Sequence, residues 1–233
     1  MGGRIDCYLD IVSFYSYVGF ADLMKNLDQL AANDVEVEFH PVFLGGINNL
    51  SGNQPPWLLP AKAVYLGADS LRAAERLSLP YQGGPKDLMA MSKTLSPLRA
   101  LHFIKANYPT STFLSVFALF FHRLWTPPHV NLIDDVNLEA ALVEATERLD
   151  GGGKLFTAED VARIMAGRDS MRDRVKQMTD GAVEKGAFGA PWMWVTNGEG
   201  KTAAFFGSDR FNHIYRFLGI PFQDVAVLPP SKL

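Results

Sequence analysis

Polar and apolar residues alternate near the start of the chain and then recur at intervals of three and four. Residues 5–12 read Ile-Asp-Cys-Tyr-Leu-Asp-Ile-Val, which mixes β-branched and aromatic side chains at the length of one strand. Residues 15–32 carry apolar side chains at helical spacing, namely Phe20, Leu23, Leu27, Leu30 and Ala31. Residues 35–43 alternate again. The pattern predicts a strand, a helix and a parallel strand, which form a right-handed βαβ unit.

The middle of the chain, residues 60–180, has a helical pattern interrupted by turns rich in glycine and proline. Thr157 is followed by Asp160 at the spacing of an N-cap with an acidic first turn. Residues 113–121 form the longest apolar run. This run is too short to span a bilayer, so it predicts a buried helix and no membrane span.

A residue pattern typical of strands returns after Gly186. Residues 191–196 and 202–206 predict a hairpin around the turn at 197–200, and a final helix is expected over 209–218. The resulting order, βαβ, helical block, ββα, is that of a thioredoxin-like fold in the α/β class.

The interruption of that order by helices predicts two domains. We expect residues 1–60 plus 181–233 to form a discontinuous thioredoxin-like domain. Residues 61–180 are expected to form an all-helical insertion domain.

Composition narrows the possible functions. The chain has 233 residues, 48% of them apolar, and a net charge of −3 with no block of one sign, so a nucleic-acid partner is not expected. Its five histidines and single cysteine, Cys7, lack metal-ligand spacing, which predicts no metal site and excludes an internal disulfide. Arg4, Asp6 and Asp10 stand where a signal peptide needs an apolar stretch, so we expect no export signal.

The first predicted helix begins at Ser-Phe-Tyr-Ser, with Ser13 and Ser16 at the spacing of a Cys-x-x-Cys motif. In thioredoxin-like redox enzymes the helix dipole at this position lowers the pKa of a thiol. Two serines retain that setting but do not exchange disulfides themselves, which indicates a site that stabilises an anion of another molecule. The alternative is that Ser13 or Ser16 is only an N-cap.

Three further motifs each allow two interpretations. Ala190-Pro191 precedes a strand and is either a cis bond that presents the Ala190 backbone to an extended peptide or an ordinary trans proline. Ser208, Asp209 and Arg210 suit a zwitterionic amino-acid group, or are a plain N-cap beside a surface Asp–Arg pair.

The third motif is Ser-Gly-Asn-Gln-Pro-Pro at residues 51–56, with Lys62 six residues on. It either presents Asn53 and Lys62 to a carboxylate or is only a polar turn.

Together these motifs resemble the kappa-class glutathione transferases along nearly the whole chain, within the DsbA-like thioredoxin superfamily. The resemblance rests on residues 10–20, 51–56 with Lys62, 185–191 and 206–210. It extends more weakly to the 2-hydroxychromene-2-carboxylate isomerases, which share the fold and also use glutathione.

Three residues depart from the kappa-class pattern. Phe14 replaces the usual proline, Tyr17 the usual tryptophan, and Trp192 the usual threonine. These departures affect the expected pocket for the electrophile more than the glutathione site.

The resemblance implies a homodimer that conjugates glutathione to small electrophiles, with a hydroperoxide-reducing activity as a further possibility, and glutathione as co-substrate. Ser13 is then the catalytic residue that stabilises the thiolate. Tyr15 or Ser16, which are also expected to contact glutathione, are the alternatives for that role. The remaining glutathione contacts implied are Asn53 and Lys62 at the glycine carboxylate, Ala190 and Pro191 at the cysteinyl backbone, and Ser208, Asp209 and Arg210 at the γ-glutamyl group. The alternatives are a glutathione-dependent cis-trans isomerase and a non-catalytic binding protein.

The last three residues are Ser231, Lys232 and Leu233, the tripeptide that a peroxisomal import receptor reads. Two prolines precede them and favour an extended tail. We therefore expect a peroxisomal protein, with a cytoplasmic or mitochondrial protein as the alternative.

Overall fold

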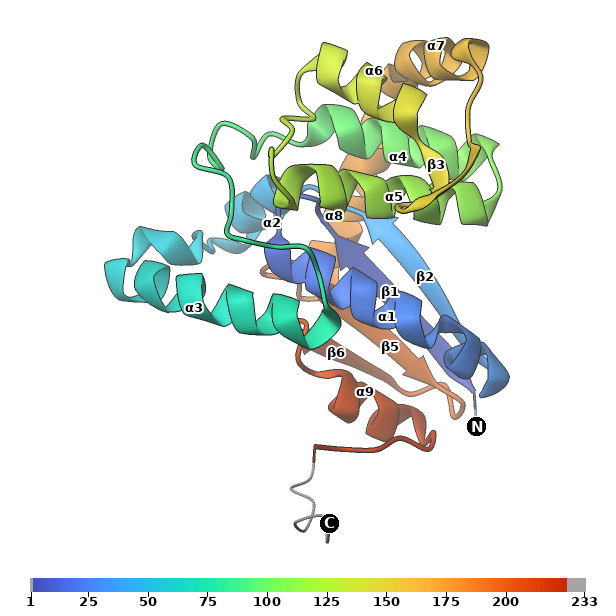
Figure 1. Ribbon diagram of the computed structural model, residues 1–233. Coiled ribbons are helices and arrows are strands. Elements are labelled where there is room, and N and C mark those ends of the chain that lie inside the picture. Colours follow the sequence, from blue (N-terminus) through green and yellow to red (C-terminus); the bar gives the residue numbers. More distant parts are fainter. Residues whose placement is uncertain (1, 226–233) are drawn as a thin grey trace, which may run out of the picture.

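A mixed four-stranded sheet lies at the centre of the structure, a computed structural model that describes residues 2–225 (Figure 1). Its strands are β1 (Gly3–Leu9), β2 (Val35–Pro41), β5 (Trp192–Asn197) and β6 (Thr202–Phe206), in the order β2-β1-β5-β6. β1 pairs in parallel with β2 and antiparallel with β5, and β5 pairs antiparallel with β6. The predicted βαβ unit, the hairpin and the thioredoxin-like fold are confirmed.

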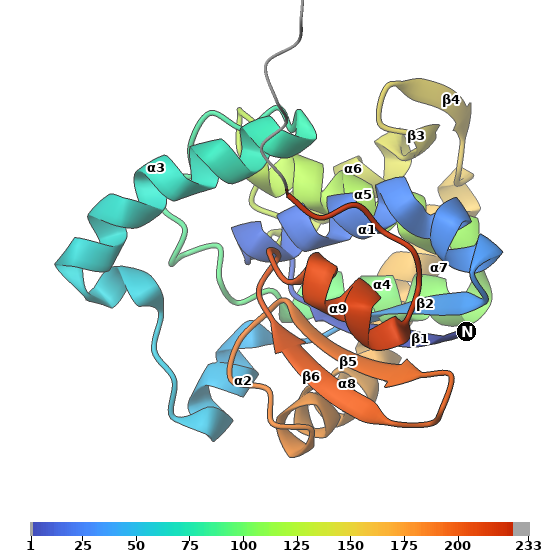
Figure 2. The same cartoon turned by 90° about the horizontal axis from the view of Figure 1, so that it is seen from below.

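Helices cover both faces of this sheet (Figures 1 and 2). On one face lie α1 (Phe14–Ala32) and α9 (Phe211–Leu218), and on the other lies α8 (Arg172–Glu184). Successive residues of β1 point to opposite faces, so Cys7 joins the core under α1 whereas Tyr8 joins a smaller cluster under α8.

The remaining helices lie between β2 and β5 in the sequence. They are α2 (Leu44–Ser51), the short 3-10 helix η1 (Pro56–Leu58), α3 (Pro60–Leu77), α4 (Leu95–Asn107), α5 (Thr110–Trp125), α6 (Asp135–Glu144), α7 (Ala158–Gly167) and the 3-10 helix η2 (Arg168–Met171). In Figure 1, α4 to α7 stack above α1, and α3 extends to one side beside it. Phe117, Phe120 and Phe121 of α5 are fully buried, which confirms the predicted buried helix.

One detail of the predicted insertion differs: residues 61–180 are not all helical. β3 (Thr146–Arg148) and β4 (Gly151–Lys154) form a small antiparallel sheet. Gly151 and Gly152 adopt positive φ values of 134° and 110°, which a helix does not use, and the Gly153 N–H donates to the Glu147 carboxylate. The three glycines thus favour a hairpin over a helical turn.

The ends of two elements also differ from the pattern. β1 stops at Leu9 rather than at Val12, because the Asp10 side chain accepts the Val12 N–H at 3.2 Å and turns the chain. The sequence pattern did not indicate α2, whose adjacent Gly45 and Gly46 have low helix propensity. The N-cap at Thr157 is confirmed as a full capping box with Asp160.

The predicted boundary between residues 180 and 181 falls inside α8. One hydrophobic core includes residues from both predicted parts, such as Leu23 and Met193 from one and Phe117 and Leu138 from the other. The division into two domains therefore stays a prediction.

The sequence also predicts no membrane span, no metal site and a peroxisomal location. Within residues 2–225, every helix is too short or too polar to cross a bilayer. The same residues contain no group of three His, Cys, Asp or Glu side chains placed to hold one metal ion. The targeting tripeptide Ser231, Lys232 and Leu233 lies outside the described residues, and the peroxisomal address stays a prediction.

Candidate functional site

Ser13 stands at the N-terminus of α1, between the end of β1 and the start of the helix. Its backbone is extended (φ −91°, ψ 113°), and its Oγ accepts the N–H of Ser16 at 3.1 Å, so Ser13 is the N-cap of α1. The same hydroxyl donates to the Ala190 carbonyl oxygen at 2.8 Å. Ser13 therefore caps its own helix and also joins it to a segment 177 residues further along the chain.

The Ala190–Pro191 peptide bond is cis, which confirms the predicted cis state, whereas presentation of the Ala190 backbone to a peptide stays a prediction. Pro191 leads directly into β5, and its carbonyl oxygen accepts the Gly207 N–H at 3.1 Å. The cis bond thus lies beside both the start of α1 and the loop before α9.

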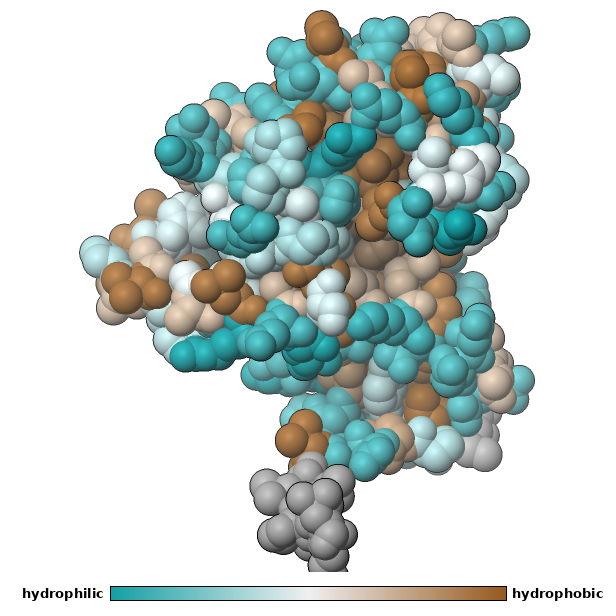
Figure 3. Space-filling model, in the orientation of Figure 1, coloured by the Kyte–Doolittle hydropathy of each residue, from teal (hydrophilic) through white to brown (hydrophobic). Residues whose placement is uncertain are grey.

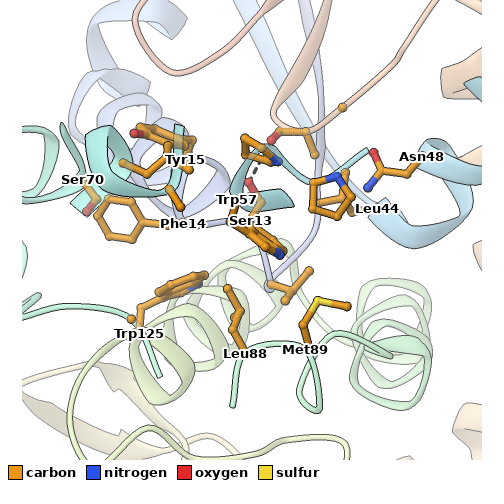
Figure 4. Close-up of a pocket in the computed structure, with 18 of the residues that line it drawn as sticks. Ser13, Phe14, Tyr15, Leu44, Asn48, Trp57, Ser70, Leu88, Met89 and Trp125 are labelled. Atoms are coloured by element: carbon orange, nitrogen blue, oxygen red, sulfur yellow. Dashed lines mark hydrogen bonds between the residues drawn. The ribbon is translucent and has the colours of Figure 1, made fainter. Parts of the chain in front are cut away.

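A cavity of about 720 Å³ opens beside Ser13 and has two walls. We call the lining residues from the predicted thioredoxin part the thioredoxin wall: Val12, Ser13, Phe14, Tyr15, Leu44, Asn48, Asn53, Gln54, Pro55, Pro56, Trp57, Gly189, Ala190 and Phe206. We call the others the helical wall: Ala63, Leu66, Gly67, Ser70, Tyr81, Gly84, Lys86, Asp87, Leu88, Met89, Ala90 and Trp125. Figure 4 shows Leu88, Met89 and Trp125 across the cavity from Ser13.

An aromatic cluster joins the two walls. The ring of Phe14 lies 4.0 Å from that of Tyr81 and 5.3 Å from that of Trp125, measured between centroids. The Trp125 Nε1–H donates at 2.8 Å to the carbonyl of Ile11, two residues before Ser13 in the chain. Of the three departures from the kappa-class pattern, Phe14 lines this cavity, whereas Tyr17 and Trp192 do not.

Tyr15 lines the cavity, but its hydroxyl proton is already shared. The hydroxyl donates to the Asp69 carboxylate at 2.5 Å, and Tyr65 donates to the other oxygen at 3.1 Å. Burial, followed by the bond to Asp69, raises the pKa of Tyr15. In this arrangement Tyr15 has no free proton for a thiolate.

Ser16 is fully buried and is not part of the cavity lining. Its hydroxyl has no hydrogen-bond partner within residues 2–225. The structure therefore does not bring Ser16 to the site, because the second serine of the motif already lies in the first turn and faces the protein interior.

The two residues predicted at the glycine carboxylate lie differently. Asn53 lines the cavity and donates through Nδ2 to the Phe188 carbonyl at 2.5 Å, which ties its loop to the segment before the cis bond. Gly52 ends α2 with φ 73°, so the 51–56 motif begins as a helix C-cap. Lys62 is exposed on α3 and does not line the cavity.

The three residues predicted at the γ-glutamyl group lie next to the start of α1 but outside the cavity lining. Ser208 is buried; a Cβ placed on Gly19 of α1 would lie 3.7 Å from its Cβ and 3.5 Å from Pro191 Cγ. Asp209 and Arg210 form an exposed ion pair at 2.5 Å. Because α9 begins after Arg210, Ser208 is not its N-cap.

Two kinds of site residue were missed by sequence reasoning. Most of the helical wall comes from α3, α5 and the loop between α3 and α4, where no short motif marks a pocket. The other is Asp10, a fully buried carboxylate at the end of β1. Burial raises the pKa of Asp10 to about 6, against the effect of the hydrogen bonds that it accepts.

The chemistry of the site is set by hydroxyl and backbone groups without a thiol. Cys7 is the only cysteine of the chain; it lies fully buried in β1, and burial raises its pKa. The site can therefore stabilise a thiolate or another anion supplied from outside, but it has no sulfur for disulfide exchange.

A model of the DsbA-like thioredoxin domain matches residues 4–219, almost the entire chain. The chain belongs to the DsbA-like thioredoxin domain family. Its Ser13 and Ser16 stand where redox members of this group carry a pair of cysteines, so this DsbA-like protein keeps the frame without the reactive sulfurs.

Curated relatives confirm the resemblance to the kappa class. Glutathione S-transferase kappa 1 of Caenorhabditis elegans is 29% identical over 224 residues, 94% of this chain and 92% of the relative. Glutathione S-transferase kappa 1 of Homo sapiens is 27% identical over 230 residues, 97% of this chain and 95% of the relative.

Solved structures support the fold of this DsbA-like protein. A 2-hydroxychromene-2-carboxylate isomerase matches with a TM-score of 0.67 at 17% identity, covering 93% of this chain and 94% of its own. A probable DsbA oxidoreductase from Streptomyces coelicolor also matches with a TM-score of 0.67, at 18% identity, covering 98% and 97%.

Proposed function

We propose that this DsbA-like protein is a glutathione transferase that conjugates glutathione to small electrophiles. The observation that carries the proposal is the Ser13 hydroxyl, which lies at the N-terminus of α1 and 2.8 Å from the carbonyl before the cis proline, in a cavity without a thiol. The names of the curated relatives support glutathione as the thiol supplied from outside.

In the proposed reaction Ser13 donates a hydrogen bond to the glutathione sulfur and favours its thiolate. A free thiol has a pKa of about 8.5, so lowering it by two pH units needs about 2.7 kcal/mol of selective stabilisation. A hydrogen bond to a charged group contributes about 1.5–3 kcal/mol, and the helix dipole adds about 0.3–1 kcal/mol. The thiolate sulfur then bonds to the electrophilic carbon, and the leaving group departs with the electron pair.

The bond between Ser13 and Ala190 suggests how the hydroxyl becomes available. A serine hydroxyl has one proton, and here that proton is donated to the Ala190 carbonyl. We propose that the cysteinyl N–H of glutathione donates to this carbonyl instead, as in an added strand. The Ser13 proton then turns to the sulfur, so binding of the backbone and activation of the thiol are coupled.

For the two ends of glutathione, we propose the contacts that the motif resemblance implies. Asn53 at the cavity supports recognition of the glycine carboxylate, and Lys62 would reach it from α3 by its long, exposed side chain. Ser208, which lies beside Gly19, and the exposed pair Asp209 and Arg210 that follows it in the chain support recognition of the γ-glutamyl group.

A homodimer is also part of the proposal. Apolar side chains are exposed along η1 and α3, where Figure 3 shows brown surface on the protruding arm. The most exposed are Leu58, Leu59, Val64 and Tyr65, at 54–80% of their full area. Such a patch supports an interface. Analytical ultracentrifugation of wild type and Val64→Glu is expected to give a dimer and a monomer.

The test is the ultraviolet absorbance of the glutathione thiolate, measured against pH in complexes with wild type, Ser13→Gly and Ser13→Thr. Glycine retains most of the N-cap stability but removes the hydroxyl, whereas threonine keeps both. We expect the thiolate to appear about two pH units below that of free glutathione in wild type and Ser13→Thr, and close to the free value in Ser13→Gly.

Unchanged pH profiles in Ser13→Gly would contradict the role of Ser13. Absence of glutathione binding would support a non-catalytic binding protein. Turnover of a hydroxychromene acid without conjugation of electrophiles would support the isomerase.

A further inference from the structure

Three segments that line the cavity converge on one buried carboxylate, that of Asp10. One oxygen accepts the Val12 N–H at 3.2 Å, in the turn that carries Ser13. The other accepts the Leu44 N–H at 2.7 Å, at the first residue of α2. The Thr94 hydroxyl, at the start of α4, lies 2.8 and 3.0 Å from the two oxygens.

These contacts engage the N-terminal ends of two helices, neither of which has a local side-chain cap. Threonine at an N-cap usually accepts an N–H of its own helix, but Thr94 makes no such bond and is fully buried with its hydroxyl at Asp10. The N-cap of α2 is Phe43, whose side chain has no acceptor. Asp10 therefore accepts a free N–H at the start of α2 and, at the start of α4, engages the hydroxyl that would otherwise be available to cap that helix.

The partners of Asp10 are donors, which suits an ionised carboxylate. Val12 and Leu44 offer N–H groups, and the Thr94 hydroxyl is free to donate to either oxygen. No lysine, arginine or histidine of residues 2–225 forms an ion pair with it, so hydrogen bonds alone balance its charge. An asparagine would set an N–H group against one of these donors.

We propose that Asp10 is the positioning residue of the cavity: its carboxylate holds the Ser13 turn, the start of α2 and the start of α4 in one arrangement. Two of these segments carry Ser13 and Leu44 of the thioredoxin wall. The loop that leads into the third, at Thr94, carries Leu88 and Met89 of the helical wall. The kinetic part of this proposal rests on the proposed function.

A pH dependence follows from burial of this group. Burial raises the pKa of Asp10 to about 6, so its carboxylate becomes protonated just below neutral pH. The added proton then faces the N–H and O–H donors around the carboxyl group, where only acceptors would suit it. The charged and titratable side chains on the elements around it are Arg4, Asp6, Cys7 and Tyr8 in β1, Tyr15, Tyr17, Asp22, Lys25 and Asp28 in α1, Glu36, Glu38 and His40 in β2, Lys93 before α4, and Arg99, His102 and Lys105 in α4. His102 stays neutral across this range because burial lowers its pKa to about 4.

The first test needs no ligand. Trp125 donates to the Ile11 carbonyl in the turn that Asp10 holds, so tryptophan fluorescence reports the position of that turn. We expect a fluorescence transition with a midpoint near pH 6 in wild type that is absent in Asp10→Asn. Asp22→Asn removes another buried aspartate, paired with Arg76 away from the cavity, and His40→Gln removes the histidine that is paired with Asp6. Both controls should keep the transition.

The second test is kinetic, at saturating glutathione and at a temperature where each variant is folded. Asp10→Asn should lower kcat/KM by about a hundredfold, since small displacements of reacting groups have effects of that size. Thr94→Val should lower it by about tenfold. Thr94→Ser, which keeps the hydroxyl, should stay close to wild type. If Asp10→Asn does not fold, the two Thr94 variants decide.

A purely structural Asp10 would lower the melting temperature and leave kcat/KM of the folded variants unchanged, and that result would overturn the proposal. A wild type without a fluorescence transition near pH 6 would overturn its pH dependence. If wild type neither binds nor turns over glutathione, the proposed function fails, while the fluorescence of wild type and Asp10→Asn still decides whether Asp10 positions the cavity.

Discussion

The two walls of the cavity differ in what they offer a ligand and in how the chain builds them. The thioredoxin wall presents a hydroxyl and backbone groups at Ser13 and Ala190, held by a rigid sheet and a helix N-terminus. The helical wall presents mainly side-chain surface, from Tyr81, Leu88 and Trp125 among others. Under the proposed function, we expect the thioredoxin wall to recognise the common part of the reaction, the thiol, and the helical wall its variable part, the electrophile.

The largest effect is expected from Trp125→Ala. Trp125 belongs to the helical wall but donates a hydrogen bond to the turn that carries Ser13 in the thioredoxin wall. The side chain is 3% exposed and packs against Phe14. Removing a buried tryptophan lowers the free energy of unfolding by about 3–5 kcal/mol. Chemical denaturation should show this loss, and Trp57→Ala, at a half-buried residue of the cavity, should show a clearly smaller one. Equal losses would mean that Trp125 does not join the walls.

The next effect concerns the stability contributed by Asp10. Its folded pKa of about 6 lies above the ordinary value of 3.8, so its contribution to stability is present below about pH 4 and is lost as the pH rises through about 6. The unfolding free energy of wild type relative to Asp10→Asn should therefore fall by on the order of 3 kcal/mol between pH 4 and pH 7. Urea denaturation across this range measures it; a constant difference would contradict the raised pKa.

A smaller change sharpens the assignment of the thioredoxin wall. Asp209→Ala removes the carboxylate proposed to accept from the γ-glutamyl ammonium. Because Asp209 is 71% exposed and already paired with Arg210, we expect only about a tenfold weaker binding of glutathione. Calorimetry should measure this change, and Asp87→Ala, an aspartate of the helical wall, serves as the matched control. An unchanged dissociation constant for Asp209→Ala would remove Asp209 from the site.

The smallest expected effect is on the helical wall alone. Met89 lines the cavity but is 60% exposed, so Met89→Ala removes little buried surface. We expect KM for the electrophile to rise by about two- to threefold, with the glutathione dissociation constant unchanged. A change in the glutathione constant instead would mean that the two walls do not divide the substrates.

The part of the thioredoxin wall around Ser13 and Ala190 was predictable, because these residues belong to short motifs with a recognisable local spacing, whereas Leu44 and Asn48 of α2 were not. The N-cap at Ser13 and the alternation in β1 and β5 follow from local spacing. The cis state of Ala190–Pro191 did not follow, since residue types allow both isomers.

The helical wall was not predictable from local pattern. Its cavity depends on contacts such as Phe14 against Tyr81, which join residues far apart in the chain. The role of Asp10 was also hidden, because a lone aspartate after a strand looks like an ordinary turn residue until Leu44 and Thr94 are brought to it.

The missing cap of α4 has a consequence for protein engineering. Because Thr94 turns its hydroxyl to Asp10, the start of α4 is joined to the end of β1 instead of being capped by its own threonine. The core residues of the insertion likewise belong to the same hydrophobic core as the sheet. Residues 61–180 are thus not a portable unit: grafted onto another scaffold, they would arrive with the Thr94 hydroxyl parted from its carboxylate and with an exposed apolar face, and a chimera would have to carry Asp10 and its turn along with them.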